Sequence, residues 1–224
     1  MRLMIYDNTN VKANLRDLKY LLPNNLDVGF DDLDYTIPIG LSHEWTVGGR
    51  LYRALRWVDE CKGFSNWTEA LEWLANVHPE EKITQIQVWG HGAPGRSWMG
   101  KTQVNAKSFQ EHGAVLEAIK NRMDSNSVIW FRNCGVFAGN KGQHFAKEWA
   151  RNMNCVIAAH TYIIGIFQAG LNTLRPGQEP LWSPLEGIEK GTAARPVKLK
   201  NSVLGSEKNI TLLHSKLPRW ALKR

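Results

Sequence analysis

Two short apolar runs constrain the fold of this chain more than any other feature. Residues 83–90 and 128–134 are rich in β-branched and aromatic side chains, and each run is typical of a buried strand. The first run is followed by His91, which lies between two glycines. The second run ends at Cys134, which directly precedes a glycine. If the strands are parallel neighbours, both side chains emerge at one carboxyl edge, where open α/β sheets place their sites.

Helical patterns alternate with these strands. A helix is expected after Asn66, a capping residue with Glu69 three positions beyond it, as in a capping box. Apolar residues at helical spacing predict further helices over 109–119 and 145–153, and a third buried strand follows over 155–159. This alternation predicts the α/β class, with a mostly parallel central sheet and helices on both faces.

Three further elements are expected in the first quarter of the chain. Residues 3–6 are typical of a buried strand, and leucines over 15–22 suggest a short helix before a proline. A second helix is expected in which Leu51, Leu55 and Val58 share one apolar face.

The final part of the chain has a weaker pattern, because prolines and glycines interrupt any period beyond about residue 162. Only residues 210–213 suggest a strand, at an edge. At 224 residues the chain suits one domain. We expect residues 1–165 to form the α/β core and residues 166–224 to form a loop-rich extension packed on the same domain.

Composition narrows the classes of partner. The chain has 28 Lys and Arg against 21 Asp and Glu, a net charge of +7, but the basic residues are spread out and form no nucleic-acid-binding motif. No stretch reaches the roughly 18 apolar residues that a membrane span requires. The cysteines fit neither a zinc pattern nor a disulfide framework, and the N-terminal residues lack a signal peptide. We therefore expect a cytoplasmic protein, with export by a route without a cleavable signal left open.

Several motifs are weak. The segment Gly90–Gly95 matches the dinucleotide pattern G-x-G-x-x-G, but it does not open a helix directly and no acidic strand end follows. No histidine pair has the spacing that a helix presents to zinc. We expect no metal and no cofactor. His160 follows the third buried strand and is a candidate for substrate contact at the same sheet edge, with a structural role as the alternative.

The pair of His91 and Cys134 resembles the site of caspase-like cysteine peptidases. In that group a histidine within an H-G pair ends one strand, and the cysteine ends the next, about 50 residues on. Here His91-Gly92 resembles the H-G pair and Cys134-Gly135 resembles the nucleophile with its glycine. The longer pattern is similar to a caspase-like domain of uncharacterised function that occurs in large bacterial surface proteins. The resemblance implies a three-layer sandwich.

The resemblance also implies roles for individual residues. Cys134 would attack a peptide carbonyl, His91 would act as base or proton donor, and the N–H groups of Gly92 and Cys134 would bind the oxyanion. In these families the residue two before the nucleophile lines the pocket for the side chain preceding the cut. Arg132 holds that position, so charge complementarity favours an acidic or polar side chain there. Alternatively, Arg132 points to the other face and pairs with a helix carboxylate.

Two classes of function follow. In the first, the protein is a cysteine endopeptidase with a His/Cys dyad, and its partner is a protein or peptide substrate. In the second, it keeps the caspase-like fold but works as a binding or scaffold module, with weak activity or none. The presence of both His91 and Cys134 favours the enzyme. The sequence does not indicate an oligomeric state.

Overall fold

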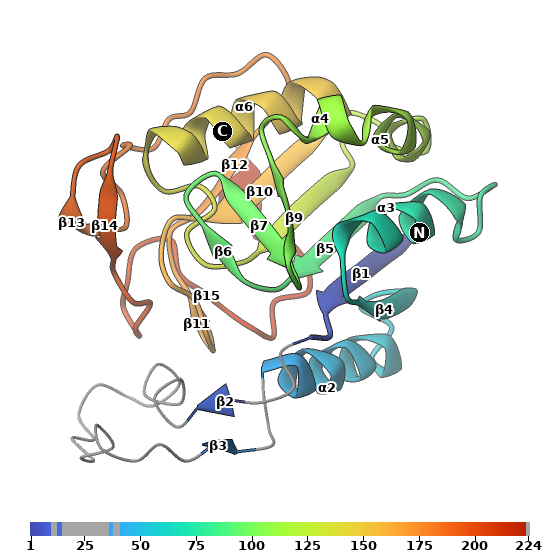
Figure 1. The fold of residues 1–224 in the computed structure, drawn as a ribbon, viewed down its shortest axis with the longest axis horizontal. Helices are drawn as coiled ribbons and strands as arrows, with labels where there is room; N and C mark the ends of the chain where they lie inside the picture. Colours follow the sequence, from blue (N-terminus) through green and yellow to red (C-terminus); the bar gives the residue numbers. More distant parts are fainter. Residues whose placement is uncertain (10–12, 15–35, 38–40, 223–224) are drawn as a thin grey trace.

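A computed structural model describes residues 1–9, 13–14, 36–37 and 41–222. Its centre is a six-stranded sheet in the order β12-β10-β9-β5-β1-β4, in which only β12 is antiparallel to its neighbour. The expected mostly parallel α/β sheet is confirmed (Figure 1). The strands are β1 Arg2–Asp7, β4 Glu60–Phe64, β5 Gln85–Trp89, β9 Val128–Arg132, β10 Val156–His160 and β12 Leu171–Leu174.

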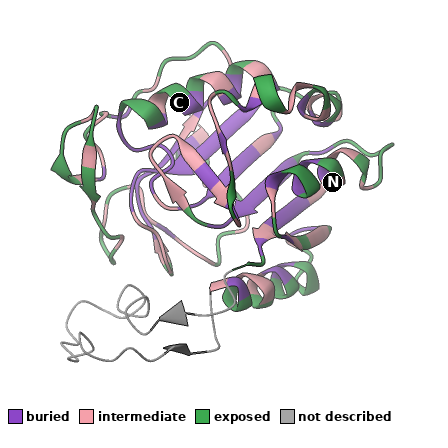
Figure 2. Cartoon of the chain, in the orientation of Figure 1, coloured by how far each residue is buried: buried purple, intermediate pink, exposed green. Residues whose placement is uncertain are grey.

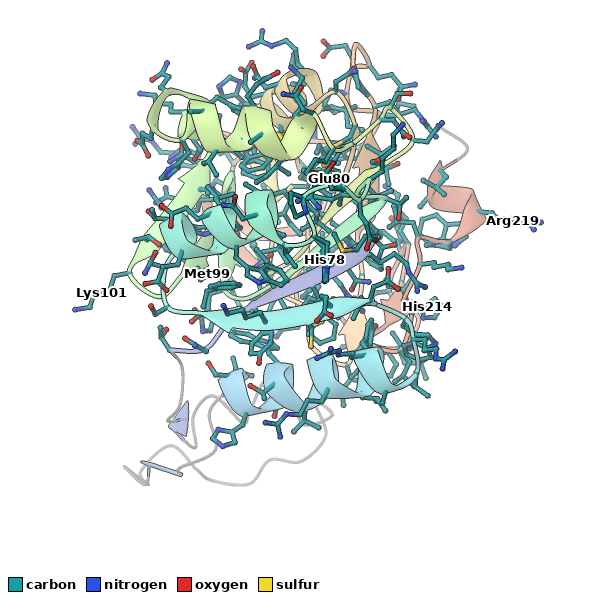
Figure 3. The ribbon with its side chains drawn as sticks, turned by 90° about the vertical axis from the view of Figure 1, so that its right-hand side faces the viewer. His78, Glu80, Met99, Lys101, His214 and Arg219 are labelled. Atoms are coloured by element: carbon teal, nitrogen blue, oxygen red, sulfur yellow. The ribbon has the colours of Figure 1, made fainter. Side chains whose placement is uncertain are left out.

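Helices cover both faces of the sheet and complete a three-layer sandwich. One face packs against α3 (Trp67–Asn76), α5 (Gly113–Lys120) and α6 (Gly139–Met153) through the largest apolar cluster. The other face packs against α2 (Leu41–Ala54), with α3 and α2 on opposite sides of β1 and β4 in Figure 3. Most residues of β1, β5, β9 and β10 are buried from both sides, whereas the edge strand β4 is mostly half-buried (Figure 2).

Smaller elements surround this sandwich. A three-stranded antiparallel sheet follows β5, and two separate two-stranded antiparallel sheets lie in the last third of the chain. These elements are β6 Gly92–Ala93, β7 Arg96–Met99 and β8 Thr102–Asn105; β11 Phe167–Gln168 with β15 Ile210–Thr211; β13 Ile188–Gly191 with β14 Pro196–Leu199; β2 Ala13–Asn14 with β3 Thr36–Ile37; α4 Ser108–Glu111; and α7 Arg219–Leu222.

The capping prediction is confirmed, because the Asn66 side chain accepts a hydrogen bond from the Glu69 N–H at 2.9 Å. The helix over 145–153 is also confirmed, as the second half of α6. The helix expected over 109–119 is instead two short helices, α4 and α5, which meet at His112.

The apolar face predicted from Leu51 and Leu55 is wrong. Their side chains are 42% and 48% exposed, and Tyr52 faces the core instead. The helix begins ten residues earlier than that pattern, at Leu41, and ends at Ala54, so Leu55 lies beyond it. The helix expected over 15–22 lies outside the described residues.

The chain beyond residue 165 is part of the same sandwich. β12 extends the central sheet, and residues Ile210, Leu217 and Ala221 pack with Trp130 on the face that α2 also covers. The strand expected at 210–213 is β15, which pairs with β11 rather than with the edge of the central sheet. Among the described residues, no helix is long and apolar enough to cross a membrane.

Candidate functional site

The register of β5 and β9 sets His91 and Cys134 at the same level of the sheet. The two strands are parallel neighbours, and Trp89 pairs with Arg132 at their carboxyl ends. His91 and Cys134 each follow two residues after that pair. The sequence-predicted pairing of these strands is therefore confirmed, and both side chains leave the same edge.

The turn that carries His91 lies directly on the turn that carries Cys134. A Cβ added to Gly92 would stand 2.6 Å from the Cys134 carbonyl oxygen and 2.7 Å from the Asn133 Cβ. Only glycine permits this approach. On the other side, Gly135 has a φ of +60°, and the N–H of Gly135 donates to the Tyr162 carbonyl at 2.9 Å.

Two hollows meet at this edge, and His91 and Cys134 line both. The first, which we call the hairpin groove, runs between the His91 turn, Ile163 and β14. The second, which we call the arginine pocket, lies under α2 and is lined by Trp45, Trp89, Arg132 and Gln168 among others. The imidazole and the thiol thus stand where an extended ligand crossing from one hollow to the other would pass.

The Cys134 sulfur is held by one main-chain segment. The N–H of Ile164 donates to the sulfur at 3.4 Å, and the thiol donates to the Ile164 carbonyl at 3.7 Å. The side chain is half-buried. Burial raises the pKa of the Cys134 thiol, against the opposing effect of the N–H groups of Ile164 and of Cys134 itself. Burial thus disfavours the thiolate form of Cys134.

The His91 side chain is exposed to solvent at the junction of the two hollows. Its ring contacts the edge of the Trp45 ring, with centroids 5.4 Å apart and planes at 75°. Trp45 lies on α2, so this helix helps to orient the imidazole. The imidazole and the thiol line the same two hollows.

The expected oxyanion donors, Gly92 and Cys134, lie on the two turns that pack together. The neighbouring N–H of Gly135 is already used by Tyr162.

Arg132 is buried on the face of the sheet that α2 covers, with 4% of the residue exposed, and it lines the arginine pocket. Its guanidinium lies 4.7 Å from the ring centroid of Trp89 and 4.5 Å from that of Trp130. The alternative, in which Arg132 pairs with a helix carboxylate, is wrong, because no carboxylate among the described residues forms an ion pair with Arg132. The hydrogen-bond acceptors are all neutral oxygens, on Tyr52, Gln87, Gln168, Thr211, Leu212 and His214.

His160 does not reach the site in this structure. Its ring is 0% exposed, Nδ1 lies 3.1 Å from the Ala169 carbonyl, and Nε2 accepts a hydrogen bond from the Trp130 indole at 3.4 Å. Burial lowers the pKa of His160 to about 3, so the ring is neutral. The placement does not support substrate contact, and it fits the structural role that was the alternative.

Sequence reasoning did not find the residues that complete the two hollows. Trp45 and Glu44 come from α2, Gln168 comes from β11, and Ile164 comes from the loop before it. Burial raises the pKa of Glu44. None of these residues lies in a periodic segment or a motif, and contacts over long sequence separations bring them to the sheet edge.

The fold is therefore a three-layer α/β sandwich with an imidazole and a thiol at the carboxyl edge of its parallel strands. Residues 62–173, half of the chain, match the model of a protein family described as a domain of unknown function, DUF4347, and the chain belongs to this family. The match includes His91, Cys134 and Arg132, but not α2 or the hairpin of β13 and β14. No curated protein matches the chain. No solved structure matches it either.

Proposed function

We propose that this protein is a caspase-like cysteine endopeptidase in which His91 and Cys134 form the catalytic dyad. The observation that carries the proposal is that both side chains line the hairpin groove and the arginine pocket where the two meet. A peptide that occupies both hollows would place a main-chain carbonyl beside the sulfur. Holding the reacting groups in this way supplies a large part of the catalysis of acyl transfer.

The raised pKa of the Cys134 thiol favours proton transfer during the attack over ionisation before it. Because burial disfavours the thiolate, His91 takes the proton as the sulfur attacks the carbonyl carbon. The C–N bond then breaks, His91 returns the proton to the leaving amine, and an acyl group remains on Cys134. Water, deprotonated by His91, hydrolyses this thioester and restores the thiol. The N–H groups of Gly92 and Cys134 stabilise the oxyanion in both steps.

The arginine pocket favours an acidic or polar side chain before the cut. Arg132 supplies a buried positive charge without a carboxylate partner among the described residues, and a substrate carboxylate would provide one. A single oxygen of Gln168 occupies the fork between Nε and Nη2, at 2.9 and 2.7 Å. A substrate carboxylate would either displace this amide or interact with Arg132 across it.

Thiol labelling tests the dyad. Iodoacetamide alkylation at pH 7, followed residue by residue with mass spectrometry, should label Cys134 at least about 10²-fold faster in the wild-type protein than in His91→Ala, the usual lower range for a general base. Cys61, whose thiol pKa burial also raises, is the internal control and should react equally in both proteins. Equal labelling of Cys134 in the two proteins would exclude the dyad and leave the binding or scaffold module as the function of this fold.

Cleavage of a peptide library tests the specificity. The expected products end in Asp, Glu or a polar residue, and Cys134→Ala should yield none. Gln168→Glu places a carboxylate of nearly the same shape on the Arg132 fork, so it should reduce cleavage after acidic residues and spare cleavage after Asn or Gln. A strict preference for Lys or Arg would refute the role of Arg132 while leaving the dyad in place.

A further inference from the structure

Asn133 joins the strand end that carries Cys134 to the turn that carries His91. Its side-chain amide donates to the main-chain carbonyl oxygen of His91 at 3.1 Å. The same oxygen accepts a second hydrogen bond from the N–H of Trp98 at 2.9 Å. The main chain of the imidazole-bearing residue is thus held from two sides, and one of the two donors comes from the residue next to the thiol.

The glycines on each side of His91 make room for Asn133. A Cβ added to Gly90 would lie 3.2 Å from the Asn133 Nδ2, and one added to Gly92 would lie 2.7 Å from the Asn133 Cβ. Such distances are tighter than ordinary van der Waals contact. The His91 turn is therefore seated on the Asn133 side chain, and the position of that side chain sets the spacing between the two turns.

The other end of the amide is buried without a hydrogen-bond partner among the described residues. Asn133 is 0% exposed, and its Oδ1 has no hydrogen-bond partner among the described residues. The bond to the His91 carbonyl fixes the orientation of the amide, since Nδ2 is the donor. A buried unpaired acceptor costs stability, and an apolar side chain of similar shape would avoid that cost. The Trp98 N–H would still satisfy the His91 carbonyl. Folding alone does not call for an amide at this position.

We propose that Asn133 is a positioning residue, whose amide holds the main chain of His91 so that the imidazole faces the Cys134 sulfur. This inference rests on the dyad of the proposed function. Asn133 itself touches neither the substrate nor the sulfur through its amide. It acts through the His91 carbonyl. Leaving Oδ1 buried and unpaired lowers the stability of the protein, and in exchange the amide provides a fixed donor to that carbonyl.

The test compares Asn133→Leu with the wild-type protein. The variant should be at least as thermally stable, because it removes an unpaired buried oxygen. Cys134 alkylation at pH 7 should nevertheless fall 10-fold or more, and the rate against pH should approach the profile of His91→Ala, which rises only toward the pKa of the isolated thiol. Asn133→Asp keeps the shape of the side chain but loses the N–H donor, so it should change the pH profile of Cys134 alkylation in the same direction. This variant tests the inference if Asn133→Leu does not fold.

Ser97→Ala is the matched control. Ser97 carries the other buried side-chain oxygen without a partner among the described residues, on β7 of the neighbouring hairpin, and its hydroxyl makes no bond to His91. Its removal should leave the pH profile of Cys134 unchanged. A folded Asn133→Leu protein with the wild-type pH profile would overturn the inference. If His91→Ala also matches the wild type, the dyad itself fails, so the two failures are distinguishable.

Discussion

Gly92→Ala tests whether the turns that carry His91 and Cys134 lie as close as the structure places them. The added methyl group would meet the Cys134 carbonyl oxygen at 2.6 Å, the Asn133 Cβ at 2.7 Å and the Val136 Cγ2 at 2.9 Å. One of these atoms belongs to the main chain and another to a Cβ, so neither can rotate away. Overpacking of this kind costs about 1–3 kcal/mol, and we expect the upper half of that range. For a chain of this size, a loss of about 2 kcal/mol lowers the Tm by roughly 4–8 °C.

Urea unfolding followed by tryptophan fluorescence measures the free energy of unfolding. Gly113→Ala is the control, since a Cβ at Gly113 meets nothing within 4 Å and this residue begins α5. It should be neutral or stabilising by up to about 1 kcal/mol. If the free energy of unfolding of Gly92→Ala lies within about 0.5 kcal/mol of the wild type, a typical effect for an unconstrained position, then the two turns do not pack together and His91 and Cys134 do not share a site.

Two further predictions concern stability away from the dyad. Asn66→Ala removes the acceptor of the Glu69 N–H at the start of α3 and should cost about 1 kcal/mol in urea unfolding; a loss below a few tenths would mean that the cap is unimportant. His160 has its pKa lowered from 6.5 to about 3, so the unfolded chain takes up the proton first, and stability that is complete above pH 6.5 is lost as the pH falls toward 3, by up to about 1.4 kcal/mol per pH unit. His160→Gln should flatten this slope between pH 6 and pH 4, and an unchanged slope would show that another group controls it.

The strand ends could be predicted because their signals are local. Apolar runs, flanking glycines and the alternation with helices place His91 and Cys134 after parallel neighbours, and the register of Trp89 with Arg132 agrees with this. Asn66 could be identified as a cap for the same reason, since the bond that it makes spans three residues. Patterns of this kind depend on a few adjacent side chains.

The walls of the site could not be predicted, because they depend on contacts across the whole chain. Arg132 is a clear example: its partners include Tyr52 on α2, 80 residues away, and Leu212, also 80 residues away. Charge pairing is the rule that sequence reasoning applies to a buried arginine, and here neutral oxygens and aromatic faces replace the carboxylate. The helix face at Leu51 was wrong for a related reason, since Tyr52 turns inward to reach Arg132.

The contacts of Gly92 and Asn133 predict how the effects of substituting the two residues combine. Gly92 and Asn133 both contact the turn that carries His91, and in the proposed dyad the reactivity of Cys134 depends on the position of that turn. Gly92→Ala would push the turn away, and Asn133→Leu would remove one of the two hydrogen bonds that the His91 carbonyl accepts. Each variant breaks one shared arrangement, so their effects on Cys134 alkylation should not multiply. The double variant should react about as slowly as the slower single variant, and a rate equal to the product of the two losses would show that the residues act on Cys134 independently.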